Sequence, residues 1–365
     1  MRLIDRYILR EFLLIAVYCL LAFVALQVLF DVFTRFSNLL TAKPPPLLML
    51  RYYLGRVAPS FQFLLPATLL FSTIYTLWNM ARHGELTAMR ASGISLLRLV
   101  GPLMVVALVA VGVVAAVNEL VVPTVGAWAA EFSRQGFQWK RARVQLNHAY
   151  YNVAARRGWL ISRFDVDNPT LLQGVQVTQE REDGSPEKRI WAEQARWLDG
   201  VWWFFDVRIQ HYNERGDPKG LEVFVPGSPM GTEMRMLTER PGDFVTELKD
   251  WDFLSAREML RYVRRRGSQS GSVLAGEMVE LHARFAMPWA CLVVTLLGIP
   301  VGALSARQNA IRGILLIMLC FFAYYGLTQV FLFLGKRQLL CPWLAAWFSN
   351  IIFLAAGVVL LVRTR

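Results

Sequence analysis

The chain has 365 residues, 55% of them hydrophobic, and its mean hydropathy of +0.37 is well above that of an ordinary soluble domain. This composition excludes a soluble protein and indicates an integral membrane protein. The formal net charge is +12, but no nucleic-acid-binding signature accompanies it, so we attribute the basic balance to cytosolic loops and anionic lipid head groups. The four cysteines show no ligand-like spacing, which argues against disulfides and a metal site.

The first apolar stretch, Phe12 to Phe30, carries no charge and is long enough to cross about 30 Å of hydrocarbon at about 1.5 Å per residue. Arg2, Arg6 and Arg10 precede it, as in a signal peptide. The stretch is too long for a cleaved segment, so we expect a retained first span. The residues from Asn38 to Arg56 contain three successive prolines and are expected to form a stiff loop.

Two further spans are expected at Val57 to Met80, where Pro66 predicts a kink, and at Leu99 to Val117. Asn118-Glu119 and Pro123 are expected to mark the exit of the third span. The segment between these two spans is short, polar and amphipathic.

Within that segment, apolar side chains form one stripe of a short helix that Ser92-Gly93 is suited to end. The stripe consists of Leu86, Ala88, Met89, Ala91 and Ile94. Arg82, Glu85 and Arg90 lie around the rest of the helix. One interpretation is a solvated loop whose arginines follow the positive-inside bias. The other is a coupling helix at the cytosolic membrane surface that presents Glu85 to a soluble motor.

From Thr124 to about Trp251 charges become frequent, no run is long enough to span, and a period of two replaces the long apolar runs. In Val201 to Tyr212 one face carries apolar residues and the other carries charged and polar ones. The apolar face is predicted to hold Val201, Trp203, Phe205, Val207 and Ile209. Glycine-containing turn signals at short intervals favour an antiparallel β domain large enough for its own core.

A capping box, Ser255 to Glu258, predicts a short helix that runs to about Arg266 and is ended by Gly267. Three more charge-free spans follow at Phe285 to Leu304, Gly313 to Leu334 and Trp343 to Val362. The expected architecture is therefore three spans, an inserted β domain and three spans.

The orientation follows from basic residues in the short connections. On the side of the N-terminus we count ten: Arg2, Arg6, Arg10, Arg82, Arg90, Arg98, Arg307, Arg312, Arg363 and Arg365. On the opposite side we count six: Arg35, Lys43, Arg51, Arg56, Lys336 and Arg337. The excess predicts that both termini lie in the cytosol and that the β domain lies outside.

The spans contain essentially no ionisable groups for acid, base or metal chemistry, so no catalytic residue and no metal ligand is expected. Glu277, Glu280, His282 and Arg284 gather before the fourth span, and we interpret them as interfacial charges with a Glu280 to Arg284 helix pair rather than as a catalytic site. No GxxxxGK[ST] motif is present. The chain is therefore expected to bind no nucleotide cofactor of its own.

The run GELTAMRASGIS, from Gly84 to Ser95, resembles the corresponding segment of the LptF/LptG family, the permease subunits of the lipopolysaccharide-exporting ABC transporter. The phrase LSAREMLRYVRRRGSQSG, which begins at Leu254, also resembles this family, and the LptG branch more than LptF. The resemblance covers essentially the whole chain. It implies an α-helical membrane protein with three parts. Residues 1–123 hold spans 1–3 and a coupling helix at about 81–93. Residues 124–266 form a periplasmic β-jellyroll-like domain and a short helix, and residues 267–365 hold spans 4–6.

The resemblance also implies functional sites. Glu85 matches the glutamate that engages the ATPase, and the surrounding coupling residues are Arg82, Leu86, Met89, Arg90 and Gly93. Spans one and five line the family's lateral gate, for which the candidates here are Leu26, Leu29, Phe30, Phe33, Phe321, Tyr324, Tyr325 and Phe331. These residues can equally pack helices or face lipid. An apolar wall is required, because exposing one acyl chain of about twelve carbons to water costs on the order of 10 kcal/mol.

For the lipid phosphates, Arg35 is the nearest candidate, although Asp31 stands where the LptG branch can carry a lysine. Trp203 and Phe205 are candidates for a periplasmic lipid path, or for core residues of the β domain.

The family partners are a cytoplasmic ATPase dimer that binds ATP, a paralogous six-span subunit and a periplasmic bridge protein of similar β fold, with lipopolysaccharide as cargo at the bacterial inner membrane. Two other functions stay open. One is an ABC-linked mechanotransmission protein that carries no lipid, which requires the same coupling helix. The other is a membrane-anchored periplasmic scaffold, for which Glu85 is dispensable.

Overall fold

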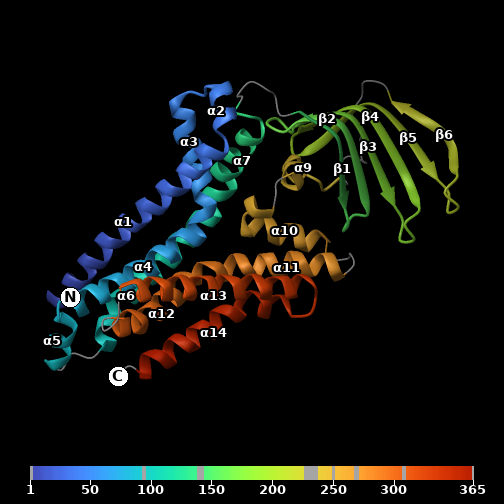
Figure 1. Ribbon diagram of the computed structural model, residues 1–365. Helices are drawn as coiled ribbons and strands as arrows, with labels where there is room; N and C mark the ends of the chain where they lie inside the picture. Colours follow the sequence, from blue (N-terminus) through green and yellow to red (C-terminus); the bar gives the residue numbers. More distant parts are fainter. Residues whose placement is uncertain are drawn as a thin grey trace. The chain divides into compact units, whose positions relative to one another are not determined.

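The computed structural model describes residues 3–92, 96–137, 144–225, 237–248, 251–266, 271–305 and 310–363 of the chain. It divides into two compact units, a helical unit and a β unit (Figure 1). The helical unit comprises Met1–Gln138 and Gly271–Arg365, and the β unit comprises Trp139–Ser270. The β unit is therefore an insertion between the two halves of the helical unit.

Among the described residues of the helical unit, six helical stretches are long and apolar enough to cross a membrane. These spans are Asp5–Thr34, Pro46–Arg82, Val100–Arg134, Ala275–Pro300, Met318–Lys336 and Pro342–Arg363. Their elements are α1 (Leu3–Thr34), α2 (Phe36–Ala42), α3 (Pro46–Val57), η1 (Ala58–Ser60), α4 (Phe61–Arg82), α5 (Glu85–Ala91), α6 (Leu96–Ala116), η2 (Val117–Gly126), α7 (Ala127–Arg134), α11 (Gly271–Ala286), η4 (Met287–Trp289), α12 (Ala290–Ser305), α13 (Ala310–Lys336) and α14 (Pro342–Arg363). Together with the antiparallel sheet of the β unit, the six spans confirm the predicted fold class.

The predicted loop from Asn38 to Arg56 is wrong, because α2 and α3 occupy most of it. α2 ends at Ala42, Lys43 adopts a left-handed conformation with φ of 43°, and Pro45 is extended. Pro46 is then the first residue of α3. The first residue of a helix needs no N–H for the helical ladder, so a proline starts this helix instead of preventing it.

The third span is longer than predicted, and the β unit begins later. After α6 the helical path continues through η2, which is a π-helix, and through α7 to Arg134. Pro123 lies inside η2, where the wider turns let a helix continue past a residue that lacks an N–H. The predicted exit at Asn118 and the predicted start of the β domain at residue 124 are therefore wrong, and the boundary between the two units follows Gln138.

The centre of the helical unit is the packing of α4 against α12. Leu70 and Ile74 of α4 share one buried cluster with Val293 and Leu297 of α12. A Cβ atom added to Gly302 would lie 3.1 Å from the Cα atom of Ile74, so the glycine permits the close approach of the two helices. The predicted Pro66 lies inside α4.

α1 is the least embedded of the spans. Only 6% of its most apolar stretch is buried, against 28% to 78% for the other five described spans. Its buried residues lie towards its two ends: Ile8 and Phe12 are fully buried near the N-terminus, and Asp31 is buried near the other end. Between them, Gln27 donates a hydrogen bond of 2.6 Å to Ser60.

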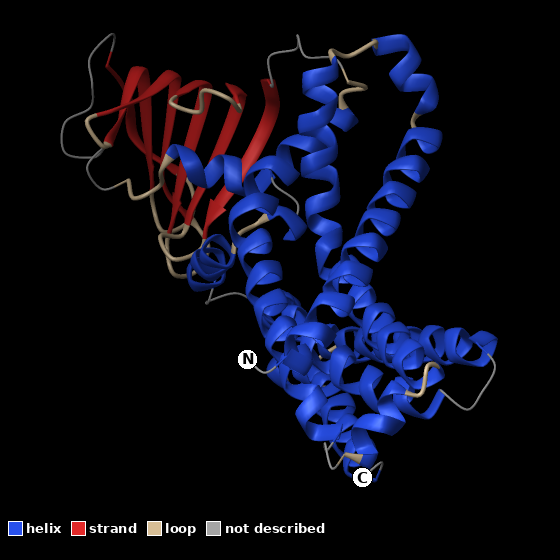
Figure 2. Cartoon of the chain, turned by 90° about the vertical axis from the view of Figure 1, so that its left-hand side faces the viewer, coloured by secondary structure: helices blue, strands red, loops and turns tan. Residues whose placement is uncertain are grey.

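The strands of the β unit form one antiparallel sheet in which each pairs with its neighbours in the chain (Figure 2). Their order is β1 (Val144–Asn152), β2 (Arg157–Asp165), β3 (Leu171–Glu180), β4 (Pro186–Leu198), β5 (Val201–Tyr212) and β6 (Pro218–Val225). The remaining described elements of this unit are α9 (Pro241–Leu248), η3 (Trp251–Phe253) and α10 (Ala256–Arg266). This confirms the antiparallel β domain that the period of two predicts.

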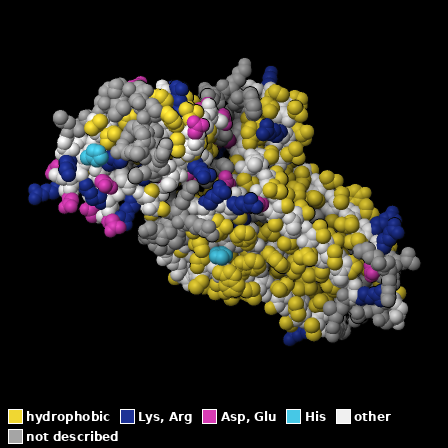
Figure 3. All heavy atoms as spheres, turned by 180° about the vertical axis from the view of Figure 1, so that it is seen from behind, with side chains coloured by type: hydrophobic (Ala, Val, Ile, Leu, Met, Phe, Trp, Pro, Cys, Tyr) yellow, Lys and Arg dark blue, Asp and Glu magenta, His cyan; other side chains and the backbone are white. Residues whose placement is uncertain are grey.

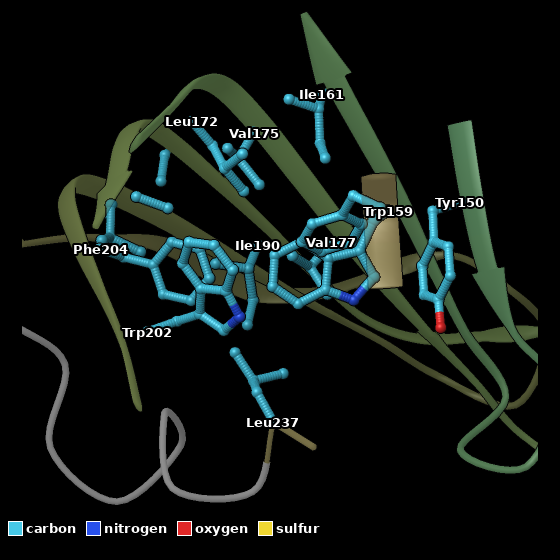
Figure 4. Close-up of a cluster of buried hydrophobic side chains, with 14 of the residues drawn as sticks. Tyr150, Trp159, Ile161, Leu172, Val175, Val177, Ile190, Trp202, Phe204 and Leu237 are labelled. Atoms are coloured by element: carbon cyan, nitrogen blue, oxygen red, sulfur yellow. The ribbon is translucent and has the colours of Figure 1, made fainter. Parts of the chain in front are cut away.

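One face of the sheet carries the core of the β unit (Figure 4). Trp159, Trp202 and Phe204 are at most 2% exposed. α9 covers part of this face, since the fully buried ring of Phe244 lies 5.2 Å from Trp159 and 5.1 Å from Tyr150, measured between ring centroids. The inner face of the sheet is therefore an aromatic core that the chain itself fills.

A line of irregular residues crosses five strands of the sheet, and we call it the crease. It consists of Asn147, Ser162, Gly174, Glu193 and Asp206, on β1 to β5. The flanking residues pair in register on both sides, but these five do not pair with one another in the ladder. On alternate strands the crease residue has positive φ: 49° at Asn147, 61° at Gly174 and 52° at Asp206. Along these strands, the alternation between inward-facing and outward-facing side chains shifts by one residue at the crease.

The crease overturns part of the prediction for β5. Val207 and Ile209 are buried as predicted, but on the other side of Asp206 the buried residues are Trp202 and Phe204. Trp203, Phe205 and Val201 therefore lie on the opposite face and are half-buried. The prediction requires an unbroken period of two from Val201 to Tyr212, and the left-handed Asp206 breaks it.

Polar contacts of Glu239 hold the chain that follows the last strand against β1 and β2. Glu239 is 1% exposed, accepts a hydrogen bond of 2.8 Å from Asn152 and forms an ion pair of 2.9 Å with Arg157. The predicted capping box is confirmed, because the N–H of Ser255 donates to the Glu258 carboxylate at 2.8 Å and the N–H of Glu258 donates to the Ser255 hydroxyl at 3.2 Å. Gly267, predicted to end this helix, lies outside the described residues.

Candidate functional site

The predicted coupling segment is a short separate helix. α4 ends at Arg82, Gly84 turns the chain with φ of +76°, and Glu85 is the first residue of α5. Leu86 is buried, and Met89 packs against the same cluster, which also contains Met80 of α4. A helix therefore exists at the predicted place, docked by two apolar residues.

Not every residue of the predicted stripe takes part in this packing. Ala88 and Ala91 are exposed, so the stripe is narrower than predicted. Arg82 belongs to α4, where its guanidinium lies 5.3 Å from the ring of Trp78. The side chain of Arg90, and the whole of Gly93 and Ile94, lie outside the described part of the chain.

Glu85 contacts the first span. The hydroxyl of Tyr7 in α1 lies 3.2 Å from each carboxylate oxygen of Glu85. The carboxylate also lies at the N-terminus of α5, where the helix dipole favours a negative charge. A long-range contact of this kind leaves no local signal, and the sequence therefore did not indicate Tyr7.

The end of the helical unit that holds α5 also holds both chain termini (Figure 1). Ile8 near the N-terminus, Leu86 of α5 and Leu361 near the C-terminus belong to one buried cluster. The turn between α2 and α3 lies at the other end of the unit (Figure 1).

Apolar side chains cover much of the face of the helical unit seen in Figure 3. On α1 the four predicted gate residues all point outward: Leu26, Leu29, Phe30 and Phe33 are 52% to 73% exposed. They form an apolar surface that the described residues of the chain leave uncovered.

On α13 the predicted gate residues are divided. Tyr324 and Tyr325 are buried, and their hydroxyls donate hydrogen bonds to the Asn350 side chain and, at 3.0 Å, to the Gln62 carbonyl. The structure places these two in the packing between helices rather than on an exposed surface. Phe321 and Phe331 are half-buried, whereas Phe322 and Phe333 of the same helix are exposed.

At the end of the helical unit opposite α5, Asp31 joins three helices. It is 6% exposed and accepts hydrogen bonds from Tyr52 at 2.7 Å, Arg56 at 3.0 Å and Arg35 at 3.2 Å. Arg35 also donates to the hydroxyl of Ser133 in α7. Arg35, the predicted phosphate contact, is thus engaged with a carboxylate of the same chain.

Two other predicted sites can be placed. Glu280 forms an ion pair with Lys336 of α13, and Arg284 donates to the Asn118 carbonyl in η2, so both side chains tie α11 to neighbouring helices. In the β unit, the lipid-path candidates Trp203 and Phe205 lie on the outer face of the sheet. The residues that line the inner face instead are Trp202 and Phe204.

The scan against protein-family models matches residues 6–363 to the lipopolysaccharide export system permease LptF/LptG. The chain belongs to the LptF/LptG family. Membership makes this permease a transport protein rather than an enzyme, and with its six apolar helices it is a multi-pass protein of the inner membrane. A comparison with curated proteins gave no match. The preference for the LptG branch stays a prediction, because one family model covers both subunits.

Proposed function

We propose that this LptF/LptG permease is one six-span subunit of an ABC transporter that extracts lipopolysaccharide from the inner membrane and passes it to a periplasmic bridge protein. The observation that carries this proposal is the match of the family model to residues 6–363. The partners are a paralogous six-span subunit and a cytoplasmic ATPase dimer. The sequence has no P-loop motif, so ATP is bound by that ATPase and this chain holds no cofactor.

Two features of the helical unit support these separate roles of the permease and the ATPase. α5 carries Glu85 at its N-terminus and packs between α4 and the first turns of α1, which suits a helix that receives the movement of a cytosolic ATPase. α1 presents an uncovered apolar surface made of Leu26, Leu29, Phe30 and Phe33, which suits the wall of a cavity for acyl chains. The paralogous subunit supplies the facing wall.

In the proposed cycle, ATP-driven closure of the ATPase pushes α5 through Glu85, the two permease subunits close, and lipopolysaccharide leaves towards the β units. The inner face of the sheet, with Trp202 and Phe204, is apolar enough to shelter acyl chains. Because Phe244 of α9 fills this face in the present structure, α9 has to move before a chain enters.

Native mass spectrometry of the protein, purified gently from its own membranes, tests the proposal. A complex that contains an ATPase dimer, a second six-span subunit and a lipopolysaccharide mass is the expected result. An ATPase without lipid in repeated preparations would favour mechanotransmission. A chain without partners under mild conditions would favour a membrane-anchored scaffold and contradict the proposal.

A further inference from the structure

The second and third spans are interrupted side by side. In the second span the 3₁₀ turn η1 separates α3 from α4, and in the third span the π-helix η2 separates α6 from α7. η1 and η2 contact each other. A Cβ atom added to Gly55 of α3 would lie 2.4 Å from the Val125 carbonyl oxygen of η2, so the two spans approach closely here. The two interruptions therefore form one region of the fold.

Beyond this region, α2, α3 and α7 pack into a body of their own, which we call the α3–α7 body. Its buried cluster contains Tyr52 of α3 with Ala129 and Phe132 of α7, and Leu39 of α2 packs against it. Among the described residues, this cluster has no member from α4 or α12. α1 also reaches the body, but only 6% of its most apolar stretch is buried, so α1 can follow a movement of the body.

Near each interruption, a proline deprives one backbone carbonyl of its helical donor. In an α-helix the Gln62 carbonyl would accept a hydrogen bond from the N–H of residue 66, but Pro66 has no N–H. In a π-helix the Asn118 carbonyl would accept one from the N–H of residue 123, but Pro123 has no N–H. An unpaired carbonyl is costly inside a membrane, where no water replaces the missing donor.

Side chains from the C-terminal half of the chain supply both missing donors. The buried hydroxyl of Tyr325 in α13 donates to the Gln62 carbonyl at 3.0 Å. The guanidinium group of Arg284 in α11 donates to the Asn118 carbonyl. Because a side chain rather than the next helical turn holds each carbonyl, the carbonyl can be released while the helical hydrogen bonds on either side stay intact. The two spans can therefore bend at the level where Tyr325 and Arg284 hold them.

We propose that η1 and η2 form a double hinge for the α3–α7 body, and that Tyr325 and Arg284 hold this hinge in the position seen here. Prolines and π-helical turns are the usual places where a helix bends. The role of Arg284 thus differs from the predicted helix pair with Glu280, whose carboxylate pairs with Lys336. The inference concerns this chain alone and does not rest on the proposed export function.

The experiment measures the distance between α3 and α6 with spin labels on the full chain in lipid nanodiscs. Leu47 and Val109 are exposed positions for the labels, in a background whose native cysteines are replaced. Tyr325→Phe removes only the hydroxyl donor. It is expected to raise the ratio of a second distance to the wild-type distance by about fivefold, the equivalent of one hydrogen bond of about 1 kcal/mol. A label pair on Leu40 and Leu50, inside the α3–α7 body, is the control and keeps its distance.

Restoring the missing N–H groups tests the cause. Pro66→Ala supplies a donor to the Gln62 carbonyl, so its combination with Tyr325→Phe is expected to return to the wild-type distance. Arg284→Met removes the other side-chain donor and is expected to add the second distance, and Pro123→Ala is expected to reverse this effect. Each alanine is expected to fail with the other variant, because the two carbonyls lie in different spans.

Three results would overturn the proposal. The first is an unchanged distance between α3 and α6 in Tyr325→Phe. The second is an equal change in the control pair, which would mean that the whole fold loosens. The third is that either alanine reverses both variants alike, which would mean that the missing N–H groups are not the cause. If Arg284→Met does not fold, Tyr325→Phe and its combination with Pro66→Ala decide the question, because that pair leaves every charge in place.

Discussion

Among the predicted coupling residues, Glu85 has the most specific predicted role, which is contact with the ATPase. We predict that Glu85→Lys weakens the association with the ATPase by at least about 30-fold, because breaking one buried charge pair at an interface costs about 2 kcal/mol or more. The new ammonium group also replaces the acceptor of the Tyr7 hydroxyl and opposes the dipole of α5. The measurement is the recovery of the ATPase with the permease on affinity purification at increasing salt.

The control for this variant makes the same charge change elsewhere. Glu187 is exposed at the start of β4, so Glu187→Lys is expected to leave the recovery of the ATPase unchanged. Equal recovery with Glu85→Lys and with the wild type would remove Glu85 from the coupling role.

His148 makes the stability of the β unit depend on pH. It is 8% exposed, and burial lowers the pKa of its imidazole below the usual value. Below a pH of about 6.5 the unfolded chain therefore binds a proton that the folded chain resists, and the free energy of unfolding falls as the pH falls. We predict that this loss is largely absent in His148→Leu and unchanged in His211→Leu, since His211 is exposed. Thermal unfolding followed by near-ultraviolet circular dichroism at several pH values checks this.

Among the elements, the crease restricts most clearly which residue type can occupy a position. Gly174 has φ of +61°, and a Cβ atom there would lie 2.6 Å from the Ser162 hydroxyl oxygen. We predict that Gly174→Ala destabilises the β unit by about 2 kcal/mol or more, since a left-handed alanine costs about 1–2 kcal/mol before any clash. The free energy of unfolding from denaturant titration is the measurement.

Gly200 provides a control that separates the cost of the left-handed conformation from the cost of the clash with Ser162. It also has positive φ, at +79°, but a Cβ atom there meets nothing within 4 Å. Gly200→Ala is therefore expected to cost only the conformational part, about 1 kcal/mol. A Gly174→Ala variant no less stable than Gly200→Ala would show that Ser162 moves aside and that the crease tolerates a side chain.

The elements also show what a local pattern can and cannot predict. The spans and the strand at Val201 to Tyr212 were found at the right places, because long apolar runs and alternation are local properties. The helix that starts at Pro46 was missed because a proline is compatible with both a loop and a first helical residue. The change of phase in β5 could not be predicted, because an aspartate within an alternating segment does not by itself indicate a residue with positive φ.

For the whole molecule, the order of spans and sheet was predictable, but the contacts that define the sites were not. Glu85 could be selected from its segment, whereas its partner Tyr7 is 78 positions away in the chain. The same holds for Asp31, whose partner Tyr52 lies on a helix that was predicted to be a loop. Residues that join distant segments are determined by packing, and one sequence carries no signal for them.

The orientation of the molecule in the membrane gives a final prediction. The excess of basic residues on the side of the N-terminus predicts that α5 and both termini lie in the cytosol and that the turn between α13 and α14 lies in the periplasm. Cys341 is exposed in that turn, whereas Cys19, Cys291 and Cys320 lie within spans. A membrane-impermeant maleimide is therefore expected to label the wild-type protein in intact spheroplasts and to leave Cys341→Ser unlabelled.

In the Cys341→Ser background, Ser92→Cys places a thiol just after α5 at an exposed position. Its labelling is expected only after the membrane is permeabilised. The reverse pattern, with Ser92→Cys labelled in intact spheroplasts and Cys341 protected, would mean that the molecule has the opposite orientation in the membrane. Glu85 would then lie on the same side as the cargo acceptor and away from ATP, which the coupling mechanism does not allow.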